Sequence, residues 1–275
     1  MLNIGWFSTG RGEGSQKLLR AAVEAIRDGR LAARIAFVFS NREPGQFEAT
    51  DVFFNQVRGH GIPLVTLSDA RFRREHGGQV ARSAQPLPPW RHDYDRAVAE
   101  LLATYDYDVG MLAGYMLITT PPLLESRPLL NLHPAAPGQP AGTWQDVTWQ
   151  LIDQRVDHGG VRIHLVTPAL DEGPIVTYCT YALRGATIDL LWRGVENRTV
   201  AEIRETDGES NPLFQEIRRR GAARELPLVV ETLRALADER LRLEGDRIMA
   251  GDTRIVGGYD LTPEIEGALA KATSA

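Results

Sequence analysis

Residues 128–134 read Pro128-Leu129-Leu130-Asn131-Leu132-His133-Pro134, an apolar run that ends abruptly in polar side chains. This pattern is typical of a buried parallel strand that reaches the carboxyl edge of its sheet. Ligands of open α/β sheets bind outside that edge. The stretch therefore predicts an α/β fold with a mostly parallel sheet, and it makes Asn131 and His133 candidate functional residues.

The chain before this stretch alternates between predicted strands and predicted helices. An apolar run at 2–8 is stopped by glycines, and apolar residues at helical spacing follow it at 16–26. Further predicted elements are strands at 35–40, 62–65 and 109–113 and a helix at 94–105. Because this alternation is typical of a parallel sheet, residues 1 to about 135 are predicted to form one open α/β unit.

The chain after this stretch is predicted to continue the sheet and then to change character. The next predicted elements are a helix at 143–152 and strands at 161–166 and 175–181, which flank a turn that carries Asp171. Residues 184–220 are polar and mixed, residues 227–241 are strongly helical, and residues 243–256 predict a hairpin around Ala250-Gly251-Asp252. The reactive residues are therefore expected on loops at strand ends, ahead of a C-terminal helix and hairpin.

The composition is that of an ordinary soluble protein. The chain has 275 residues, of which 43% are hydrophobic, enough to bury a sizeable core. A formal net charge of −5 argues against broad electrostatic attraction to nucleic acid or to an anionic membrane. The single cysteine, Cys179, excludes an internal disulfide, and no window approaches the length of a transmembrane helix. We therefore expect a cytoplasmic location, small-molecule substrates, and neither nucleic-acid nor membrane partners.

Asn131, His133 and Asp171 together offer the groups that are needed to move an acyl group between nitrogens. Such a transfer passes through a tetrahedral oxyanion, which the Asn131 amide can stabilise as a neutral donor. The His133 imidazole suits the proton transfers because the unperturbed pKa of histidine is about 6.5. The Asp171 carboxylate can orient and polarise that imidazole, directly or through a water. Taken singly, each residue could instead satisfy the backbone of a turn, and only the joint pattern favours catalysis.

These residues also lie in a longer pattern that resembles a known family. Residues 158–174 read His158-Gly159-Gly160-Val161-Arg162-Ile163-His164-Leu165-Val166-Thr167-Pro168-Ala169-Leu170-Asp171-Glu172-Gly173-Pro174. The folate-dependent formyltransferases carry Asn-x-His-Pro and later His-Gly-x-x-x-His-x-Val-Thr-x-x-Leu-Asp-x-Gly-Pro, and the chain most closely resembles the members that act on glycinamide ribonucleotide. The match is specific from His164 onward, and before it this chain has one extra residue.

The resemblance implies a reaction and an organisation of the chain. The reaction is transfer of a formyl group from 10-formyltetrahydrofolate to a primary amine, with glycinamide ribonucleotide as the leading acceptor and no metal. We expect one formyltransferase-like domain over 1–275, with an open sheet and helices on both faces. Its phosphate-binding α/β half would span 1–135, and its catalytic half 136–275, with an insertion near 184–220. The insertion could cover the site, contact a second copy in a homodimer, or lie at the surface without a role.

A glycine-rich turn after the first strand is the candidate phosphate site. The family's turn Ser-Gly-x-Gly-Ser-Asn grips the phosphate of the ribonucleotide, and Gly12-Glu13-Gly14-Ser15 aligns with it. Backbone amides at a helix N-terminus can hold a phosphate. The Glu13 carboxylate would repel a phosphate unless it points away or Arg11 offsets it. A tight strand-to-helix turn without a ligand is the alternative.

A second loop is the candidate folate site. Residues 112–118 resemble the family's Leu-Ala-Gly-Phe-Met-Arg-Ile loop, which holds the pteridine, and this makes Met116, Leu117 and Ile118 the folate-binding candidates. Apolar walls and backbone hydrogen bonds suit a flat heteroaromatic ring. Ordinary core packing after a strand is the alternative, and Leu117 replaces the family's arginine.

The remaining histidines and the cysteine receive weaker assignments. The family has a histidine beside the catalytic centre at the position of His164, although a strand histidine packed under the sheet is an equal alternative. His158 and His164 lie six residues apart with His133 upstream, but no cysteine or carboxylate completes a metal-ligand set at a familiar spacing, so we predict no metal site. Cys179 in its apolar strand is predicted to be a buried core thiol.

Departures from the family leave the acceptor open. The loop after His133 differs from the family's, and Trp144 replaces a histidine near the catalytic carboxylate. A 10-formyltetrahydrofolate hydrolase, in which water replaces the amine, is therefore an alternative. Others are a formyltransferase for another amine, such as an amino sugar nucleotide, and a folate- or nucleotide-binding module without turnover.

Overall fold

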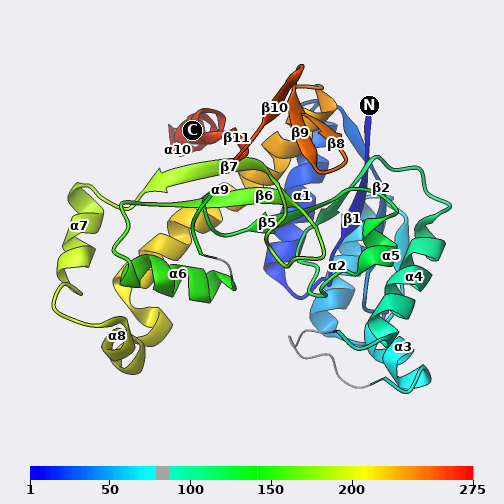
Figure 1. The fold of residues 1–275 in the computed structure, drawn as a ribbon, viewed down its shortest axis with the longest axis horizontal. Helices are drawn as coiled ribbons and strands as arrows, with labels where there is room; N and C mark the ends of the chain where they lie inside the picture. The colour runs from blue at the N-terminus through cyan, green and yellow to red at the C-terminus, as the bar shows by residue number, and fades with distance from the viewer. Residues whose placement is uncertain (79–86, 141, 275) are drawn as a thin grey trace.

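An eight-stranded sheet runs through the molecule (Figure 1). The computed structural model describes residues 1–78, 87–140 and 142–274. The strand order is β11-β7-β6-β5-β4-β1-β2-β3. These strands are β1 (Leu2–Phe7), β2 (Ala33–Ser40), β3 (Leu64–Thr66), β4 (Val109–Leu112), β5 (Leu129–His133), β6 (His158–Leu165), β7 (Ile175–Ala182) and β11 (Tyr259–Asp260). The predicted α/β class with an open, mostly parallel sheet is confirmed.

The sheet changes direction between the two halves of the motif. Strands β1 to β5 pair in parallel, whereas β6 runs antiparallel to both β5 and β7. β7 then pairs in parallel with β11. Because β5 and β6 run in opposite directions, the polar end of β5 pairs with residues in the second half of β6, where Arg162 and His164 lie.

Helices cover both faces of the sheet, as predicted (Figure 1). One face is covered by α1 (Glu13–Arg27), α2 (Glu48–Gly59) and α9 (Pro212–Ala237). The other face is covered by α3 (Asp69–Glu75), α4 (Trp90–Leu102) and α5 (Pro121–Leu124). α6 (Trp144–Asp153) and α7 (Ala186–Arg193) pack against α9, and α8 (Val200–Thr206) packs against α6. α10 (Thr262–Ser274) also packs beside α9.

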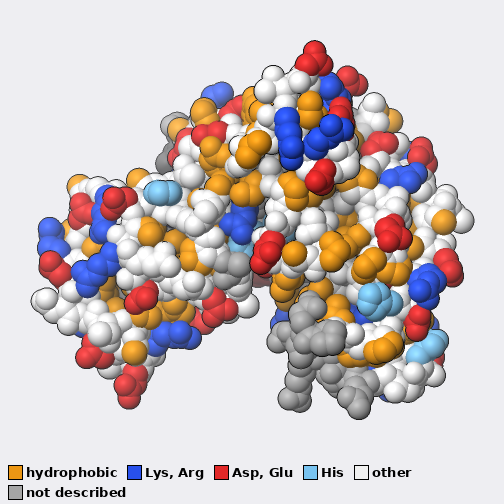
Figure 2. Space-filling view, in the orientation of Figure 1, with side chains coloured by type: hydrophobic (Ala, Val, Ile, Leu, Met, Phe, Trp, Pro, Cys, Tyr) orange, Lys and Arg blue, Asp and Glu red, His pale blue; other side chains and the backbone are white. Residues whose placement is uncertain are grey.

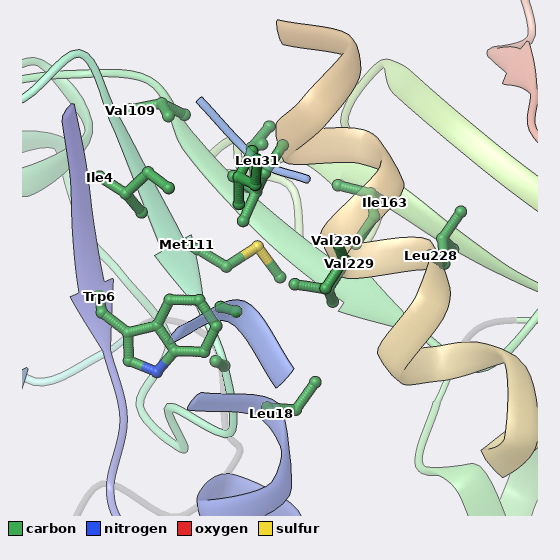
Figure 3. Packing of buried hydrophobic residues seen from close by; sticks show 14 of the residues in the cluster. Ile4, Trp6, Leu18, Leu31, Val109, Met111, Ile163, Leu228, Val229 and Val230 are labelled. Carbon is green, nitrogen blue, oxygen red and sulfur yellow. The ribbon is translucent and has the colours of Figure 1, made fainter. Parts of the chain in front are cut away.

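The core between α1, α9 and the sheet follows the alternation of side chains along the strands. Trp6 of β1 and Met111 of β4 face this layer, whereas Phe7 packs in the cluster on the opposite face, with α4. Figure 3 shows Leu18 of α1 and Leu228 of α9 packed around the same layer. Burial of each such side chain stabilises the fold by roughly 1.5–3 kcal/mol. This packed core supports the sheet edge that carries the polar residues.

The segment 184–220 is mostly helical, whereas the sequence predicted only a polar and mixed stretch. It forms α7, α8 and the first part of α9, which pack with α6 around Trp149, Trp192 and Phe214. α9 begins at Pro212, well before Pro227, where its helical pattern was predicted to begin. A proline inside a helix removes one backbone donor, but burial of the apolar residues in this second cluster stabilises the additional turns.

The predicted C-terminal hairpin is part of a three-stranded antiparallel sheet. Its strands are β8 (Arg242–Glu244), β9 (Arg247–Ala250) and β10 (Thr253–Ile255). β9 and β10 meet at Gly251, which has a φ of 56° and lies in the predicted turn. β11 and α10 follow, and neither was predicted. Within the described residues, no helix combines the length and the apolar character that crossing a membrane requires.

Candidate active site

The pairing of β5 with β6 gathers four polar side chains on one face of the sheet. Asn131 lies opposite His164, and His133 lies opposite Arg162. Side chains at alternate positions of a strand point to the same face, and residues directly opposite each other on antiparallel strands are close neighbours. The antiparallel register therefore brings Asn131, His133 and His164 together, although they are distant in sequence.

The turn between β6 and β7 adds the carboxylate. The Asp171 Oδ1 atom lies 3.5 Å from Asn131 Nδ2 and 3.6 Å from His164 Nε2, and its Oδ2 atom lies 3.7 Å from His133 Nδ1. Asp171 has a φ of 58°, an uncommon value for a residue with a Cβ. At Gly173, a Cβ would lie 1.7 Å from the carbonyl oxygen of Leu165, so only glycine allows the turn to approach β6.

His164 lies inside the site, rather than packed away from it under the sheet. Its Nδ1–H donates to the carbonyl oxygen of Leu165 at 2.9 Å, so Nε2 is the nitrogen that faces the site. The Asn131 amide lies 3.3 Å from this Nε2. A neutral His164 therefore accepts a hydrogen bond from Asn131, and a protonated His164 donates toward Asp171 instead.

His133 is buried, with 2% of its surface exposed. Its Nε2–H donates to the carbonyl oxygen of Pro140 at 3.3 Å, which leaves Nδ1 facing Asp171. Burial and the positive charge of Arg162 lower the pKa of His133 to about 4, although the charge of Asp171 opposes them. The imidazole is therefore neutral at pH 7, and Nδ1 is its basic nitrogen.

Asp171 stays ionised beside these rings. A hydrogen bond from His164 and the charges of His133 and Arg162 hold the pKa of its carboxyl below the usual value, although burial opposes them. Its side chain is 17% exposed, whereas that of His133 is 3% exposed. The carboxylate is therefore the more accessible of the two proton-accepting groups.

Arg162 is a residue of this site that sequence reasoning missed. Its guanidinium donates to the carbonyl oxygen of Ala136 at 2.9 Å and lies 3.5 Å from that of Asp171. It thereby ties the loop after His133 to the turn that carries the carboxylate. A charged residue within the apolar strand, between Val161 and Ile163, is the signal that could have identified it.

A cavity of about 240 Å³ opens beside these residues. Its polar side is formed by Asn131, His164 and Asp171, and its apolar side includes Met116, Leu117 and Ile118, the predicted folate loop. The lining residues include Asp171 but not His133. The molecule is also visibly hollowed between the part that carries α6 to α8 and the part that carries α2 to α4 (Figure 2).

Hydrogen bonds from two directions hold the backbone of the predicted folate loop, residues 112–118. The amide of Met116 donates to Thr9 Oγ1 at 3.0 Å, and Arg91 Nη2 donates to the carbonyl oxygen of Ile118 at 2.7 Å. Asp95, which is fully buried, pairs with Arg91 and accepts from both the amide and the hydroxyl of Thr120. Arg91 and Asp95 were not singled out from the sequence, and both support this loop.

The glycine-rich turn lies at the start of α1, as predicted. Glu13 is exposed and pairs with Lys17 at 2.8 Å, one turn further along the helix. Its charge is therefore offset by a residue of its own helix. A Cβ at Gly12 or Gly14 would meet no atom within 4 Å, so these positions border open space. Ser15 is buried, and its Oγ lies 2.7 Å from the position that a Cβ on Gly114 would occupy.

Trp144, which departs from the family pattern, begins α6 and takes part in a charged contact. The guanidinium of Arg218 lies 4.9 Å from the centre of the Trp144 ring and pairs with Glu225. This contact joins α6 to α9, so Trp144 has a packing role.

The described residues contain no group of three or more histidine, cysteine, aspartate or glutamate side chains that could hold a metal ion. Cys179 is buried in β7, and burial raises the pKa of its thiol to about 11. A thiol with this pKa is almost entirely protonated at pH 7, which agrees with a core role.

Comparison with known proteins supports the reading of the motif. The formyl transferase family matches residues 11–183. The phosphoribosylglycinamide formyltransferase of Escherichia coli K12 is 27% identical over 168 residues, which are 60% of this chain and 66% of that enzyme, slightly less than two thirds of its length. The formyltetrahydrofolate deformylase of Bacillus subtilis is 35% identical over 88 residues, 31% of this chain and 29% of that protein.

A solved structure agrees with the fold over nearly the whole chain. Glycinamide ribonucleotide transformylase 1 from Symbiobacterium toebii is 27% identical and superimposes with a TM-score of 0.62, covering 91% of this chain and 94% of that one. The family match extends over more than half of the chain, through β5, β6 and the Asp171 turn. The chain therefore belongs to the formyl transferase family, a family of folate-dependent enzymes.

Proposed function

We propose that the protein transfers a formyl group from 10-formyltetrahydrofolate to the primary amine of glycinamide ribonucleotide. The observation that carries this proposal is the meeting of Asn131, His133 and Asp171 next to the cavity lined by Met116 to Ile118. The similarity to enzymes named for the same acceptor supports it.

The chemistry requires one bond to form and another to break. The amine nitrogen of the acceptor attacks the formyl carbon, and the carbonyl oxygen becomes an oxyanion in the tetrahedral intermediate. The Asn131 amide, on the polar side of the cavity, donates a hydrogen bond to that oxygen. The carbon–nitrogen bond to the folate then breaks, and the products are the formamide and tetrahydrofolate.

The attacking nitrogen must lose a proton, and the departing nitrogen must gain one. Asp171 lines the cavity, and the basic Nδ1 of His133 lies 3.7 Å behind it. The proton passes by way of Asp171, directly or through a water, to His133, and returns to the leaving nitrogen. While His133 holds the proton, its imidazolium forms an ion pair with the Asp171 carboxylate, and this ion pair stabilises the protonated imidazole.

The cavity suits the bicyclic ring of the donor rather than the donor as a whole. At about 240 Å³ it is smaller than the roughly 300–1,000 Å³ typical of sites that enclose a whole ligand. Its wall at Met116 to Ile118 combines apolar side chains with backbone groups. The rest of the donor would extend past Met116, which is 56% exposed.

The glycine-rich turn is the proposed site for the acceptor phosphate. Gly12 and Gly14 leave open space at the start of α1, where backbone amides and the helix dipole favour an anion. Glu13 pairs with Lys17, which reduces the repulsion that its charge would cause.

Hydrolysis of 10-formyltetrahydrofolate is the second candidate. The observation in its favour is the similarity to a formyltetrahydrofolate deformylase, which is 35% identical over 88 residues. The same oxyanion donor and base would serve a water as nucleophile. A different amine, such as an amino sugar nucleotide, would use the same groups, and a module that only binds folate or nucleotide would not need them.

The test is spectrophotometric. Purified protein is mixed with 10-formyltetrahydrofolate, and release of tetrahydrofolate is followed with and without glycinamide ribonucleotide. Release that depends on the ribonucleotide would establish the proposed transfer. Release without any acceptor would favour the hydrolase, and no release would indicate another amine or a role in binding alone.

A further inference from the structure

A separate cavity of about 760 Å³, the α9–α10 cavity, lies between the start of β6, the end of β7 and the helices α9 and α10. α10, at the red end of the chain, packs against both α9 and β7 (Figure 1). The residues that line the α9–α10 cavity and those that line the cavity proposed for folate have no member in common. Sites that enclose a small molecule have volumes of roughly 300–1,000 Å³. The α9–α10 cavity is therefore large enough for a ligand of its own.

Three arginines of α9 line the α9–α10 cavity, and two of them share one carboxylate. Arg219 donates from Nε and Nη2 to Glu216, at 2.7 and 2.8 Å, and Arg220 donates from Nε to the same carboxylate at 2.8 Å. Arg220 Nη1 also donates to the carbonyl oxygen of Ala182 at 2.6 Å. In the described part of the chain, Arg219 Nη1 and Arg220 Nη2 have no hydrogen-bond partner, so each can donate to a ligand.

The third arginine, Arg224, is fixed in a similar way. Its Nε donates to Glu266 of α10 at 2.6 Å, and its Nη1 donates to the carbonyl oxygen of Arg220 at 2.8 Å. Its Nη2 has no hydrogen-bond partner among the residues that the structure describes. Three guanidinium groups, each held by other contacts, therefore line one cavity with a donor to spare.

The charges around the α9–α10 cavity do not balance. Glu266 and Asp157, which both belong to the lining, each pair with a single arginine. Glu216, by contrast, pairs with both Arg219 and Arg220, which leaves one positive charge in excess. A concave site with an excess of positive charge attracts anions. Guanidinium groups bind phosphate through charge-assisted hydrogen bonds of fixed geometry, so a phosphate is the group that this lining fits.

The rest of the lining suits a ligand that is rich in hydroxyl groups. Thr180 and Thr262 supply hydroxyls, and the Glu266 carboxylate can accept from a hydroxyl of the ligand. The Tyr181 ring is only 7% exposed, and the Arg224 guanidinium lies 4.9 Å from its centre, so little of the ring is open for stacking. A sugar therefore matches this wall better than a flat aromatic ring does.

We propose that the α9–α10 cavity is a binding site for a sugar phosphate, whose phosphate is held by Arg219, Arg220 and Arg224. The two helices that form its wall lie outside residues 11–183, which the formyl transferase family matches. The site goes beyond the proposed function, and its existence does not depend on which acceptor the protein formylates.

Isothermal titration of the full chain tests this site. The probes are ribose 5-phosphate, inorganic phosphate, and ribose, which lacks the phosphate. The variants are Arg219→Gln and Arg224→Gln. Arg219→Gln is the milder of the two, because the Arg219 side chain is 68% exposed and Glu216 keeps its ion pair with Arg220. It therefore tests the site even if Arg224→Gln disturbs the packing of α10.

Arg234→Gln is the matched control. Arg234 lies on the same helix and pairs with Glu231, three residues before it, as Arg219 pairs with Glu216, but it does not line the α9–α10 cavity. Any binding of phosphate at the glycine-rich turn should be the same in all variants, because no residue of that turn lines this cavity.

We expect each cavity variant to weaken binding of ribose 5-phosphate and of inorganic phosphate by about 10-fold, as loss of a charge-assisted hydrogen bond predicts, and the control to leave both unchanged. Ribose 5-phosphate should bind more tightly than inorganic phosphate, and ribose should show no measurable binding. Unchanged affinity for both phosphates in both cavity variants would overturn the site. An equal loss in Arg234→Gln would also overturn it, because the effect would then come from net charge alone. Equal affinity for the two phosphates would refute recognition of the sugar.

Discussion

Arg162 lies directly opposite His133 across the antiparallel pair of β5 and β6, so a buried guanidinium is a neighbour of a buried imidazole. Two positive charges in this position would repel, and the arginine, which has by far the higher intrinsic pKa, keeps its proton. The histidine is therefore held neutral and ready to accept a proton. Asp171, on the other side of the ring, favours the protonated form and limits this effect.

Removal of the Arg162 charge should raise the pKa of His133. The charge of Arg162 is the second-largest cause of the lowered pKa, after burial, so Arg162→Met should move the value upward from about 4. Arg162→Lys, which keeps the charge, is the control. The measurement is an NMR titration of the His133 ring protons in the free protein. An unchanged pKa in Arg162→Met would mean that burial alone sets it.

The stability of the protein should fall in mild acid because of His133. Its pKa is about 4 in the folded protein and about 6.5 in the unfolded chain, so between these values only the unfolded chain binds the proton. The free energy of unfolding should therefore decrease as the pH falls from about 6.5 to about 4, by on the order of 3 kcal/mol. Urea unfolding at several pH values would measure this. His133→Asn should lose this part of the pH dependence, and an identical profile in the variant would assign it to other groups.

Substitution of His133 should lower the rate without abolishing folate binding. His133→Ala should reduce kcat by about 100-fold or more, in line with typical contributions of a general acid or base. Because His133 does not line the cavity proposed for folate, the affinity for tetrahydrofolate should remain close to that of the unaltered protein. His158→Ala, at an exposed histidine that begins β6, is the control. Unchanged turnover in His133→Ala would remove this residue from the mechanism.

Loss of the Asn131 amide should remove oxyanion stabilisation. Asn131→Ala should lower kcat by about 10²–10³-fold, the usual effect of deleting one oxyanion donor. Thr167→Ala is a matched control, because Thr167 lines the same cavity but its hydroxyl donates to Ala169 within its own loop. Steady-state kinetics at saturating donor and acceptor separate kcat from binding. Equal losses in the two variants would point to a general disturbance of the cavity.

Gly114→Ala should distort the loop that is proposed to bind folate. Gly114 has a φ of 75°, and a Cβ there would lie 2.7 Å from Ser15 Oγ. Strain of this kind costs about 1–3 kcal/mol, so both the free energy of unfolding and the affinity for tetrahydrofolate should decrease. Gly29→Ala is the control. Gly29 has a similar φ of 72°, but a Cβ there would meet no atom within 4 Å, so this variant shows the effect of backbone strain alone. If the two variants bind tetrahydrofolate equally well, the contact with Ser15 has no influence on the loop.

Much of the fold and part of the site could be predicted from local patterns. Apolar runs and helical spacing identified β1, β2, β4 and β5, and the polar end of residues 128–134 marked the carboxyl edge of the sheet. The motif from His164 to Pro174 predicted the family. These features are local, because the preference for strand or helix and the position of a turn depend on residues that are close in the sequence.

Other features depended on contacts between distant residues. The helical character of 184–220 comes from burial against α6 and α9, which no short window of sequence contains. The sequence could not show whether the Glu13 carboxylate is free to repel a phosphate, because its ion pair with Lys17 is visible only in the structure.

The sequence by itself therefore determined the α/β class, the family and the identity of Asn131, His133 and Asp171 as candidates. Only the tertiary structure decided that β6 runs antiparallel to β5, that His164 faces Asn131, and that Arg162 lies beside His133. The physical reason is that strand pairing and burial are set by hydrogen bonds and packing between segments far apart in the chain. The protonation of His133 follows from that arrangement, because burial and a neighbouring charge exist only after the two strands have paired.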